Sequence, residues 1–212
     1  YDAALFGFID TRLWGTAPTL YHETKSSMAS PSPITDGKHI YAFFASGDVF
    51  CLDLDGRLVW QRSLAAEYGP FENRFAASSS PLLFEDSLYV QVLHGMHTDD
   101  PSYLLRIDKA TGKTIWRVLR MTKARFESPD AYTTPALLRH GNATEIVITG
   151  GDVVTGHDPA NGQELWRADG LNPDNNPAYR IVASPVTFGD IVVAPARERP
   201  MLILKAGGPR KV

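Results

Sequence analysis

The sequence lacks the features that mark several common classes of protein. Cysteine occurs once in 212 residues, at Cys51, which excludes an intrachain disulfide and a zinc site built on cysteines. No apolar run approaches the roughly 20 residues that a helix needs to cross a bilayer, so no transmembrane segment is expected. A net charge of -3 gives no electrostatic reason to expect a nucleic-acid partner. A globular chain remains, and its 43% hydrophobic residues suffice for a packed core.

A sustained 3.6-residue apolar period is also missing, which limits helix to about one turn at residues 63–68. In its place the chain repeats itself with a period near 50 residues. Its four tryptophans are spaced by 46, 56 and 50 residues, and a Ser/Thr-Pro pair ends 19 to 21 residues after each. The tryptophans are Trp14, Trp60, Trp116 and Trp166, and the pairs end at Pro33, Pro81, Pro135 and Pro185. Such self-similarity indicates a repeat architecture.

Each repeat contains four short stretches rich in β-branched and aromatic residues and separated by tight turns, as strands are. The units span about 33–64, 81–119, 135–168 and 185–208, and segment 6–14 resembles the end of a further unit. Four-stranded antiparallel units at this spacing are typical of propeller blades. The sequence therefore predicts a single all-β domain, a β-propeller with three complete blades and two partial ones.

A shared turn precedes each of the last three tryptophans, in "DLDGRLVW", "DKATGKTIW" and "DPANGQELW". The glycine supplies the positive φ of a tight hairpin, and the aspartate can accept hydrogen bonds from the turn's N–H groups. The Trp ring can fill the wedge between blades while its indole N–H finds a carbonyl. We therefore assign blade-building roles to all four tryptophans and to the turn residues Asp53, Gly56, Asp108, Gly112, Asp158 and Gly162.

The stretches "RIDKATGKTIW" and "GHDPANGQELW" resemble the repeat Ala-x-Asp-x-x-Thr-Gly-x-x-x-Trp of the PQQ-type, or quinoprotein, β-propellers. Recognisable or partial repeats cover residues 5–208, with Arg106 or Gly156 in place of the leading Ala and Asn161 in place of one Thr. Residues 29–60 are especially similar to uncharacterised secreted PQQ-like repeat proteins of environmental bacteria. The resemblance implies a propeller and a periplasmic or secreted protein, although the chain as given shows no signal peptide.

That family includes quinone-dependent alcohol dehydrogenases and the non-catalytic outer-membrane assembly lipoprotein of Gram-negative bacteria. The dehydrogenases carry two adjacent cysteines beneath the cofactor, a Trp floor for the quinone and a Glu/Asn/Asp set for calcium. Cys51 alone cannot supply the cysteine pair, and the four tryptophans are committed to blade positions. We therefore expect no cofactor, and a binding or assembly platform for a protein, a peptide or a small polar or sugar ligand.

Two other functions remain open at this point. One is a PQQ- and calcium-dependent alcohol dehydrogenase whose remaining blades are missing from this chain. The other is a metal- or sugar-dependent enzyme that works from the loop face of the propeller.

The family's propellers have seven or eight blades, more than this chain supplies. Either the chain is a fragment of a longer protein, or segment 6–14 joins strands in 185–208 and closes a fourth blade. We favour the fragment. An open arc would leave apolar blade faces bare, which predicts self-association through the open blades or flanking sequence that covers them.

The long connections after the tryptophans are expected on one face, where propellers place binding residues. Carboxylates, amides, arginines and tyrosines on these connections suit a polar ligand or a peptide, although such residues are also ordinary in solvated loops. The candidates are Glu67, Asn73, Arg74, Glu127, Asp130, Tyr132, Asn172, Asn176, Tyr179 and Arg180. A second candidate, a divalent-metal site in "HGMHTDD", would use His94, His97 and Asp99, against which stands the ordinary loop composition of that stretch.

Overall fold

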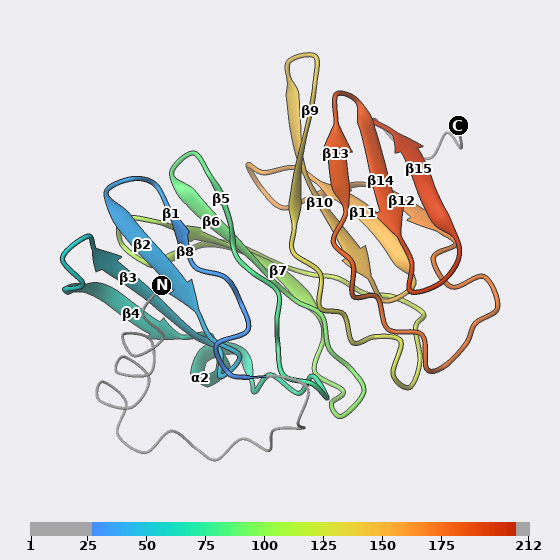
Figure 1. Ribbon diagram of the computed structural model, residues 1–212, viewed down its shortest axis with the longest axis horizontal. Coiled ribbons are helices and arrows are strands. Elements are labelled where there is room, and N and C mark those ends of the chain that lie inside the picture. The colour runs from blue at the N-terminus through green and yellow to red at the C-terminus, as the bar shows by residue number, and fades with distance from the viewer. Residues whose placement is uncertain (1–26, 207–212) are drawn as a thin grey trace.

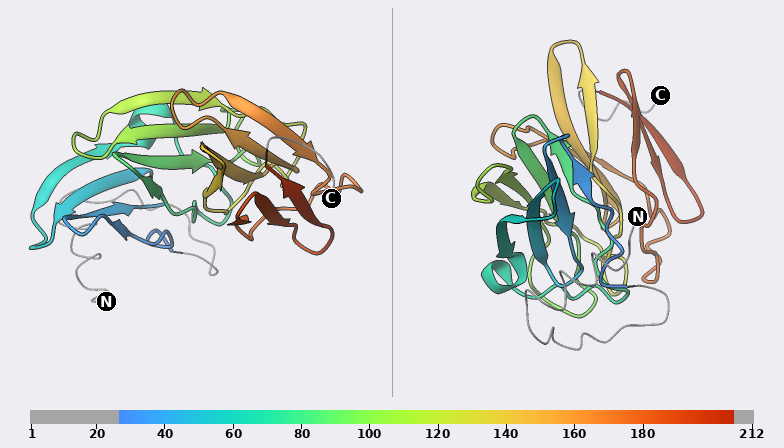
Figure 2. Two further views of the ribbon diagram at one scale, coloured as in Figure 1. Left: turned by 90° about the horizontal axis from the view of Figure 1, so that it is seen from above. Right: turned by 60° about the vertical axis from the view of Figure 1, so that its left-hand side comes forward.

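The computed structural model describes residues 27–206, which form four antiparallel sheets placed side by side along an arc (Figures 1 and 2). Three sheets have four strands and the last has three. The predicted all-β propeller is therefore confirmed, with the three complete blades and one of the two partial ones among the described residues. Trp14 and segment 6–14 lie outside the described residues.

Within every sheet the strands follow one another in chain order. The first sheet contains β1 (Ile34–Thr35), β2 (His39–Phe43), β3 (Asp48–Asp53) and β4 (Leu58–Ser63), and helix α2 (Leu64–Tyr68) follows it. The second contains β5 (Leu82–Phe84), β6 (Ser87–Val92), β7 (Tyr103–Asp108) and β8 (Thr114–Leu119). The third contains β9 (Ala136–His140), β10 (Ala143–Gly150), β11 (Val153–His157) and β12 (Glu164–Asp169). The fourth contains β13 (Val186–Phe188), β14 (Ile191–Pro195) and β15 (Met201–Lys205). None of the described helical residues forms a segment long and apolar enough to cross a membrane.

The repeated turn seats the tryptophan of the preceding blade. The indole N–H of Trp60, on β4, donates to the Lys109 carbonyl in the turn of the second blade, at 2.9 Å. Its ring lies so close to Gly112 that a Cβ there would be 2.7 Å from the ring. Trp116, on β8, repeats this arrangement one blade later and donates to the Pro159 carbonyl at 3.1 Å. Gly112 and Gly162 are thus needed both for their own backbone and for the neighbouring indole.

The aspartates of these turns accept hydrogen bonds from the turn itself, as predicted. Asp108 Oδ1 accepts from the backbone N–H and the hydroxyl of Thr111, at 2.8 and 2.7 Å. These bonds favour the charged form and lower the pKa of Asp108. The three turn glycines, Gly56, Gly112 and Gly162, have φ of 82°, 72° and 79°.

Trp166 occupies the matching place on β12 but has a different partner. It lies opposite Gly156 on β11, where a Cβ would be 2.2 Å from the indole. Its N–H donates to the Glu145 carboxylate of its own sheet and not to a carbonyl of the next blade. The turn of the fourth blade that corresponds to these two turns would follow β15, where the described residues end. Trp166 still packs in the wedge between the third and fourth sheets.

The double role of the turn glycine predicts a specific loss of stability. Gly112→Ala should lower the free energy of unfolding by about 3 kcal/mol, because it forces a left-handed alanine and displaces the Trp60 ring. Gly37→Ala is the matched control, since Gly37 has φ 83° with no atom near its missing Cβ, and should cost only about 1 kcal/mol. Urea unfolding of both variants measures the difference, and equal losses would contradict the seating role.

The Ser/Thr-Pro pairs tie the first strands of successive blades together. The backbone N–H of Ser32 donates to the Ser80 hydroxyl, that of Ser80 to Thr134, and that of Thr134 to Ser184, at 2.9, 3.1 and 2.8 Å. We name this chain of contacts the hydroxyl relay. It explains why the Ser/Thr-Pro pair recurs in register with the tryptophans. The hydroxyl accepts a hydrogen bond from the preceding blade, and the proline immediately precedes the first strand of its own blade.

Hydrophobic clusters fill the three spaces between neighbouring sheets. The outer face of the last sheet is different, because its apolar side chains are exposed, with Phe188 at 84%. Cross-strand pairing places Val186, Phe188, Met201 and Ile203 on this one face, opposite the side that packs on the third sheet. Within the described residues, the arc thus ends in the bare apolar face expected of an open arc.

Candidate binding face

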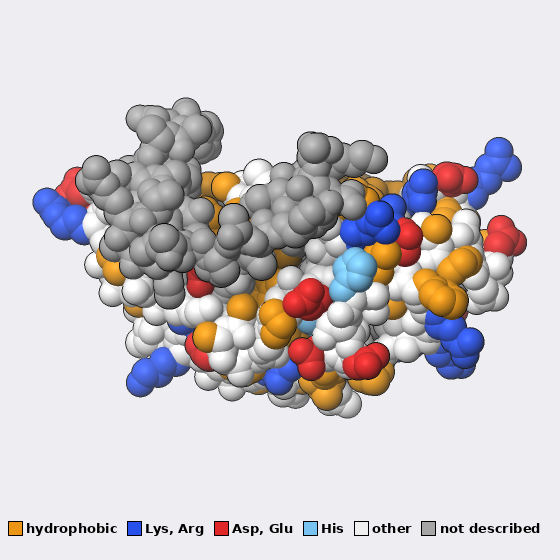
Figure 3. Space-filling model, turned by 90° about the horizontal axis from the view of Figure 1, so that it is seen from below, with side chains coloured by type: hydrophobic (Ala, Val, Ile, Leu, Met, Phe, Trp, Pro, Cys, Tyr) orange, Lys and Arg blue, Asp and Glu red, His pale blue; other side chains and the backbone are white. Residues whose placement is uncertain are grey.

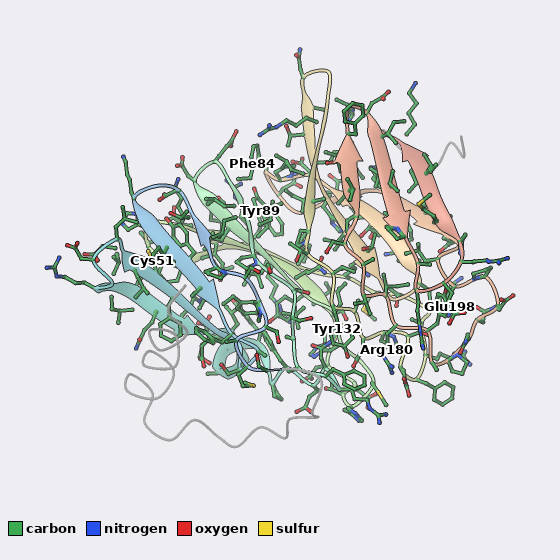
Figure 4. The ribbon with its side chains drawn as sticks, in the orientation of Figure 1. Cys51, Phe84, Tyr89, Tyr132, Arg180 and Glu198 are labelled. Carbon is green, nitrogen blue, oxygen red and sulfur yellow. The ribbon has the colours of Figure 1, made fainter. Side chains whose placement is uncertain are left out.

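Three connections between blades meet at one carboxylate on the lower side of the arc in Figure 1. Glu127, from the β8–β9 connection, forms an ion pair with Arg180, from the β12–β13 connection. Its other oxygen lies 3.7 Å from Arg74 Nη1, in the connection between α2 and β5. Figure 4 shows Arg180 and Tyr132 on this side, and Figure 3, viewed from below, shows charges of both signs among hydrophobic groups.

An aromatic ring lies between the two arginines. The guanidinium carbons of Arg74 and Arg180 lie 5.5 and 4.8 Å from the ring centre of Phe75. The Tyr132 ring is 6.3 Å from that of Phe75, and its hydroxyl oxygen accepts from the Phe75 backbone N–H at 3.4 Å. Cation–π contacts and ion pairs of this kind hold these partly exposed side chains in place.

Asp130 lies beneath this group and is fully buried. Its carboxylate accepts backbone N–H bonds from Arg74, Gly95 and Met96 at 2.9, 3.0 and 3.1 Å, and the Tyr132 hydroxyl is 3.5 Å away. Burial raises the pKa of Asp130, and the three N–H bonds oppose that shift. Asp130 therefore joins its own segment of backbone to those at Arg74 and at residues 95–96, beneath the partly buried cluster.

His94 is also buried here. Its Nδ1 accepts from the Glu72 backbone N–H at 3.4 Å, while its Nε2 has no hydrogen-bond partner among the described atoms. Burial lowers the pKa of His94, and the nearby charges of Asp130, Asp100 and Glu72 act in the opposite direction. The folded protein thus favours the neutral imidazole.

This lowered pKa predicts a pH dependence with a defined sign. An unfolded histidine binds a proton near pH 6.5 and folded His94 only at lower pH, so stability is lost as pH falls below about 6.5. His94→Asn keeps an acceptor without the titration and should flatten the curve by at most about 1.4 kcal/mol per pH unit. Buried His157, whose pKa is also lowered by burial, contributes equally to both proteins. Urea unfolding at pH 7.5 and 5.0 measures the slopes, and parallel slopes would contradict the assignment.

The other candidate residues do not join the Glu127 cluster. Asn73 is buried and donates to the Leu93 carbonyl at 2.7 Å. Asn172 and Asn176 brace their own loop, with the Asn176 N–H donating to Asn172 Oδ1 at 2.9 Å. The Tyr179 hydroxyl donates to the Arg199 carbonyl at 2.7 Å. These four side chains support loops rather than offering free polar groups.

Glu67 lies in a different place from the other candidates. It is on α2 and forms an ion pair with Arg62 of β4, beside a separate groove. The sequence placed it with the others because it follows Trp60, but the helix keeps it close to its own blade. Phe75 was not singled out from the sequence. Its contacts with Arg74 and with Arg180, the ion-pair partner of Glu127, depend on how the connections are folded and have no signal in the sequence.

The structure also bears on metal and cofactor binding. Within residues 27–206, no three or more His, Cys, Asp or Glu side chains are grouped to hold a metal, and His94, His97 and Asp99 are not brought together as one. Cys51 is buried in β3 opposite Trp60, and that indole is already seated in the next blade. The described residues therefore do not fit the cysteine pair and Trp floor of a PQQ site.

The repeated turns, the seated indoles and the arc of sheets define a PQQ-type β-propeller repeat protein. The family model PQQ_2, described as outer membrane protein assembly factor BamB, matches residues 11–97 and 67–208. The chain belongs to this family. No curated protein sequence matches the chain.

Solved structures share the fold at low sequence identity. BamB from Moraxella catarrhalis is 16% identical with a TM-score of 0.58, over 88% of this chain and 52% of BamB. Quinohemoprotein alcohol dehydrogenase from Comamonas testosteroni is 11% identical with a TM-score of 0.61, over 90% of this chain and 37% of the enzyme. A europium-containing methanol dehydrogenase is 12% identical with a TM-score of 0.63, over 84% and 40%. The chain spans about half, or less, of the length of these proteins.

Proposed function

We propose that this chain is a non-catalytic binding or assembly platform within a longer, periplasmic or secreted bacterial protein. It binds a protein or peptide partner on the face formed by the connections between blades, and it needs no cofactor. The observation that carries the proposal is the Glu127 ion-pair cluster, in which one carboxylate locks three connections into a single rigid surface. A preorganised surface binds with a smaller loss of conformational entropy.

An exposed aromatic residue beside the cluster supplies an anchor for such a partner. Phe126 precedes Glu127, is 72% exposed and has φ 58°, a strained conformation for a residue with a side chain. The backbone on both sides is fixed, since the Glu127 N–H donates to the Pro177 carbonyl and the Arg125 carbonyl accepts from the Ser128 N–H. Aromatic and arginine side chains dominate the energetics of many interfaces.

Membership of the BamB family supports assembly rather than catalysis, since the described residues do not fit a PQQ site. The share of each solved structure that is covered supports a longer protein. Further blades of that protein would also cover the exposed face of β13–β15. In the absence of such cover, that face is where copies of the chain would associate.

The partner can be sought by photo-crosslinking from the proposed anchor. A photoreactive phenylalanine analogue in place of Phe126 should yield one dominant crosslinked partner in the native host, and Arg180→Ala should reduce that yield about tenfold. The control is the same analogue in place of Phe188, which is also largely exposed, at 84%, but lies on the last sheet. Equal products from both sites would count against the loop face. If the purified protein oxidised an alcohol in the presence of PQQ and Ca²⁺, the platform proposal would be wrong and the protein would be a dehydrogenase.

A further inference from the structure

A groove of about 420 Å³ lies between the first and second blades, apart from the Glu127 cluster. It is formed by β4, α2 and the turn that joins β7 to β8. Its lining residues are Gln61, Arg62, Glu67, Tyr68, Thr111, Gly112, Lys113 and Thr114. The volume is within the range of sites that hold a small molecule or one or two residues of a peptide.

Neutral groups hold Arg62 in this groove in addition to a carboxylate. Its Nη1 donates to the Gly112 carbonyl at 2.6 Å, and its Nη2 donates to Thr114 Oγ1 at 3.0 Å. The Tyr68 hydroxyl lies 3.4 Å from Nη2 and is itself 2.8 Å from Thr114 Oγ1. The side chain of Arg62 is only 11% exposed. The second blade and α2 therefore orient the guanidinium before any acid binds it.

A carboxylate of the same chain occupies the remaining edge of that guanidinium. Arg62 Nε donates to Glu67 Oε1 at 3.0 Å, and Nη2 pairs with Oε2, so the contact is bidentate. Glu67 lies on a helix of five residues and its side chain is 41% exposed. Only the carboxylate end of this pair faces solvent, so a ligand can reach the contact without unpacking Arg62. Glu67 thus stands where the carboxylate of a ligand would bind.

The same place between the second and third blades is closed. Val118 follows Trp116 by two residues, as Arg62 follows Trp60. Val118 packs on the turn, and its Cγ1 would be 2.8 Å from a Cβ at Gly162. Blade packing therefore does not require an arginine or a groove here, and the first blade differs from the second in both respects.

The groove also has more positive charge than its one carboxylate balances. Arg62, Lys113 and Glu67 line the groove. The guanidinium carbon of Arg117 lies close by, 4.7 Å from the ring centre of Tyr68 and 4.4 Å from that of Tyr103. Arg117 Nε and the Tyr103 hydroxyl are buried and have no hydrogen-bond partner among the described atoms. In a chain of net charge -3, this is a local site that favours an anion.

We propose that this groove binds an aspartate or glutamate side chain of an acidic peptide segment, whose carboxylate replaces Glu67 on Arg62. The planar fork of an arginine matches a carboxylate in two parallel hydrogen bonds, the arrangement that Glu67 already shows. Lys113, at the edge of the groove, attracts the next acidic residue of the same segment. Glu67 is an internal competitor, which lowers the affinity of the groove for a single carboxylate. A ligand with several acidic groups makes enough contacts to displace it.

The test titrates ¹⁵N-labelled protein and follows the Nε–Hε resonance of Arg62 together with the backbone amide resonances of Gly112 and Lys113, which remain observable when Arg62 is replaced. The probes are an acetylated and amidated tetraglutamate peptide, acetate and inorganic phosphate. Glu67→Gln removes the internal competitor and should bind the peptide about tenfold more tightly than the unaltered protein does. Arg62→Lys, which cannot make the bidentate contact, should lose binding in either background.

Glu164→Gln is the matched control for the competitor. It breaks a second bidentate pair, in which Arg167 Nε and Nη2 each lie 2.7 Å from Glu164, but this pair does not line the groove. The affinity of the Glu164→Gln variant for the tetraglutamate peptide should equal that of the unaltered protein. An equal gain in this variant would show a general charge effect and overturn the proposal.

Other outcomes also decide the matter. Peptide affinities of Glu67→Gln and the unaltered protein within twofold of each other would overturn the role of Glu67. If phosphate bound more tightly than tetraglutamate, the assignment of the ligand as a carboxylate would be wrong. If acetate bound as tightly as tetraglutamate, the ligand would be a free small acid and not a peptide. Should Glu67→Gln unfold, Glu67→Asp, which keeps the charge but shortens the arm, should show the same gain. Crosslinking from Phe126 is independent of all these variants, so this groove and the loop face succeed or fail separately.

Discussion

Asp130→Ala should lower the free energy of unfolding by about 4 kcal/mol, because it leaves three backbone N–H groups buried without an acceptor. Those groups belong to Arg74, Gly95 and Met96, so the loss also separates segments that the carboxylate joins. Urea unfolding at pH 7.5 gives the size of the effect.

Two further variants show whether the N–H bonds are the cause. Asp130→Asn retains one acceptor oxygen and should lose about half as much stability. Asp174→Ala, an exposed residue of the β12–β13 connection, should change the free energy of unfolding by less than about 0.5 kcal/mol. If Asp130→Ala cost no more than Asp174→Ala, the role of Asp130 as a joint between connections would be wrong.

Arg120→Ala should cost a similar amount, about 4 kcal/mol. The side chain is buried between the second and third blades, where its three nitrogens donate to Thr155 Oγ1, the Gly150 carbonyl and the Val153 carbonyl at 2.9, 2.8 and 2.9 Å. Burial lowers the pKa of Arg120 to about 9, which still leaves it charged at neutral pH. Without it, three acceptors lose their partner and a cavity opens beside β11.

A conservative change separates charge from geometry at this position. Arg120→Lys keeps the charge but cannot reach three divergent acceptors, and it should cost about 2 kcal/mol. Arg57→Ala removes a largely exposed arginine and should cost less than about 0.5 kcal/mol. Equal stability of Arg120→Lys and the unaltered protein would show that charge alone is needed there.

The repeat could be predicted from sequence because its signals are local. Asp108, Gly112 and Trp116 lie within nine residues, and each has a backbone or packing role that its residue type suggests. The partner of Trp166 could not be predicted in this way. That partner is the carboxylate of Glu145, 21 residues earlier in the chain, and nothing in the residues around Trp166 indicates it.

The candidate site was predicted only in outline, for a similar reason. Residue types placed Arg74, Glu127 and Arg180 on connections that should share a face, and the ion pairs bring them together. Nothing local distinguishes Asp130, which is fully buried, from an exposed loop aspartate. Its burial depends on the paths of three connections more than 20 residues apart, which the repeat pattern does not determine.

The hydroxyl relay has a consequence for how such an arc gains or loses length. Each unit brings one donor and one acceptor to its seam, so the relay contact is the same at all three seams. Duplication of one unit of about 50 residues would therefore insert a sheet without leaving a relay donor or acceptor unmatched at either junction. Selection can then vary the number of sheets while each surface loop diversifies independently.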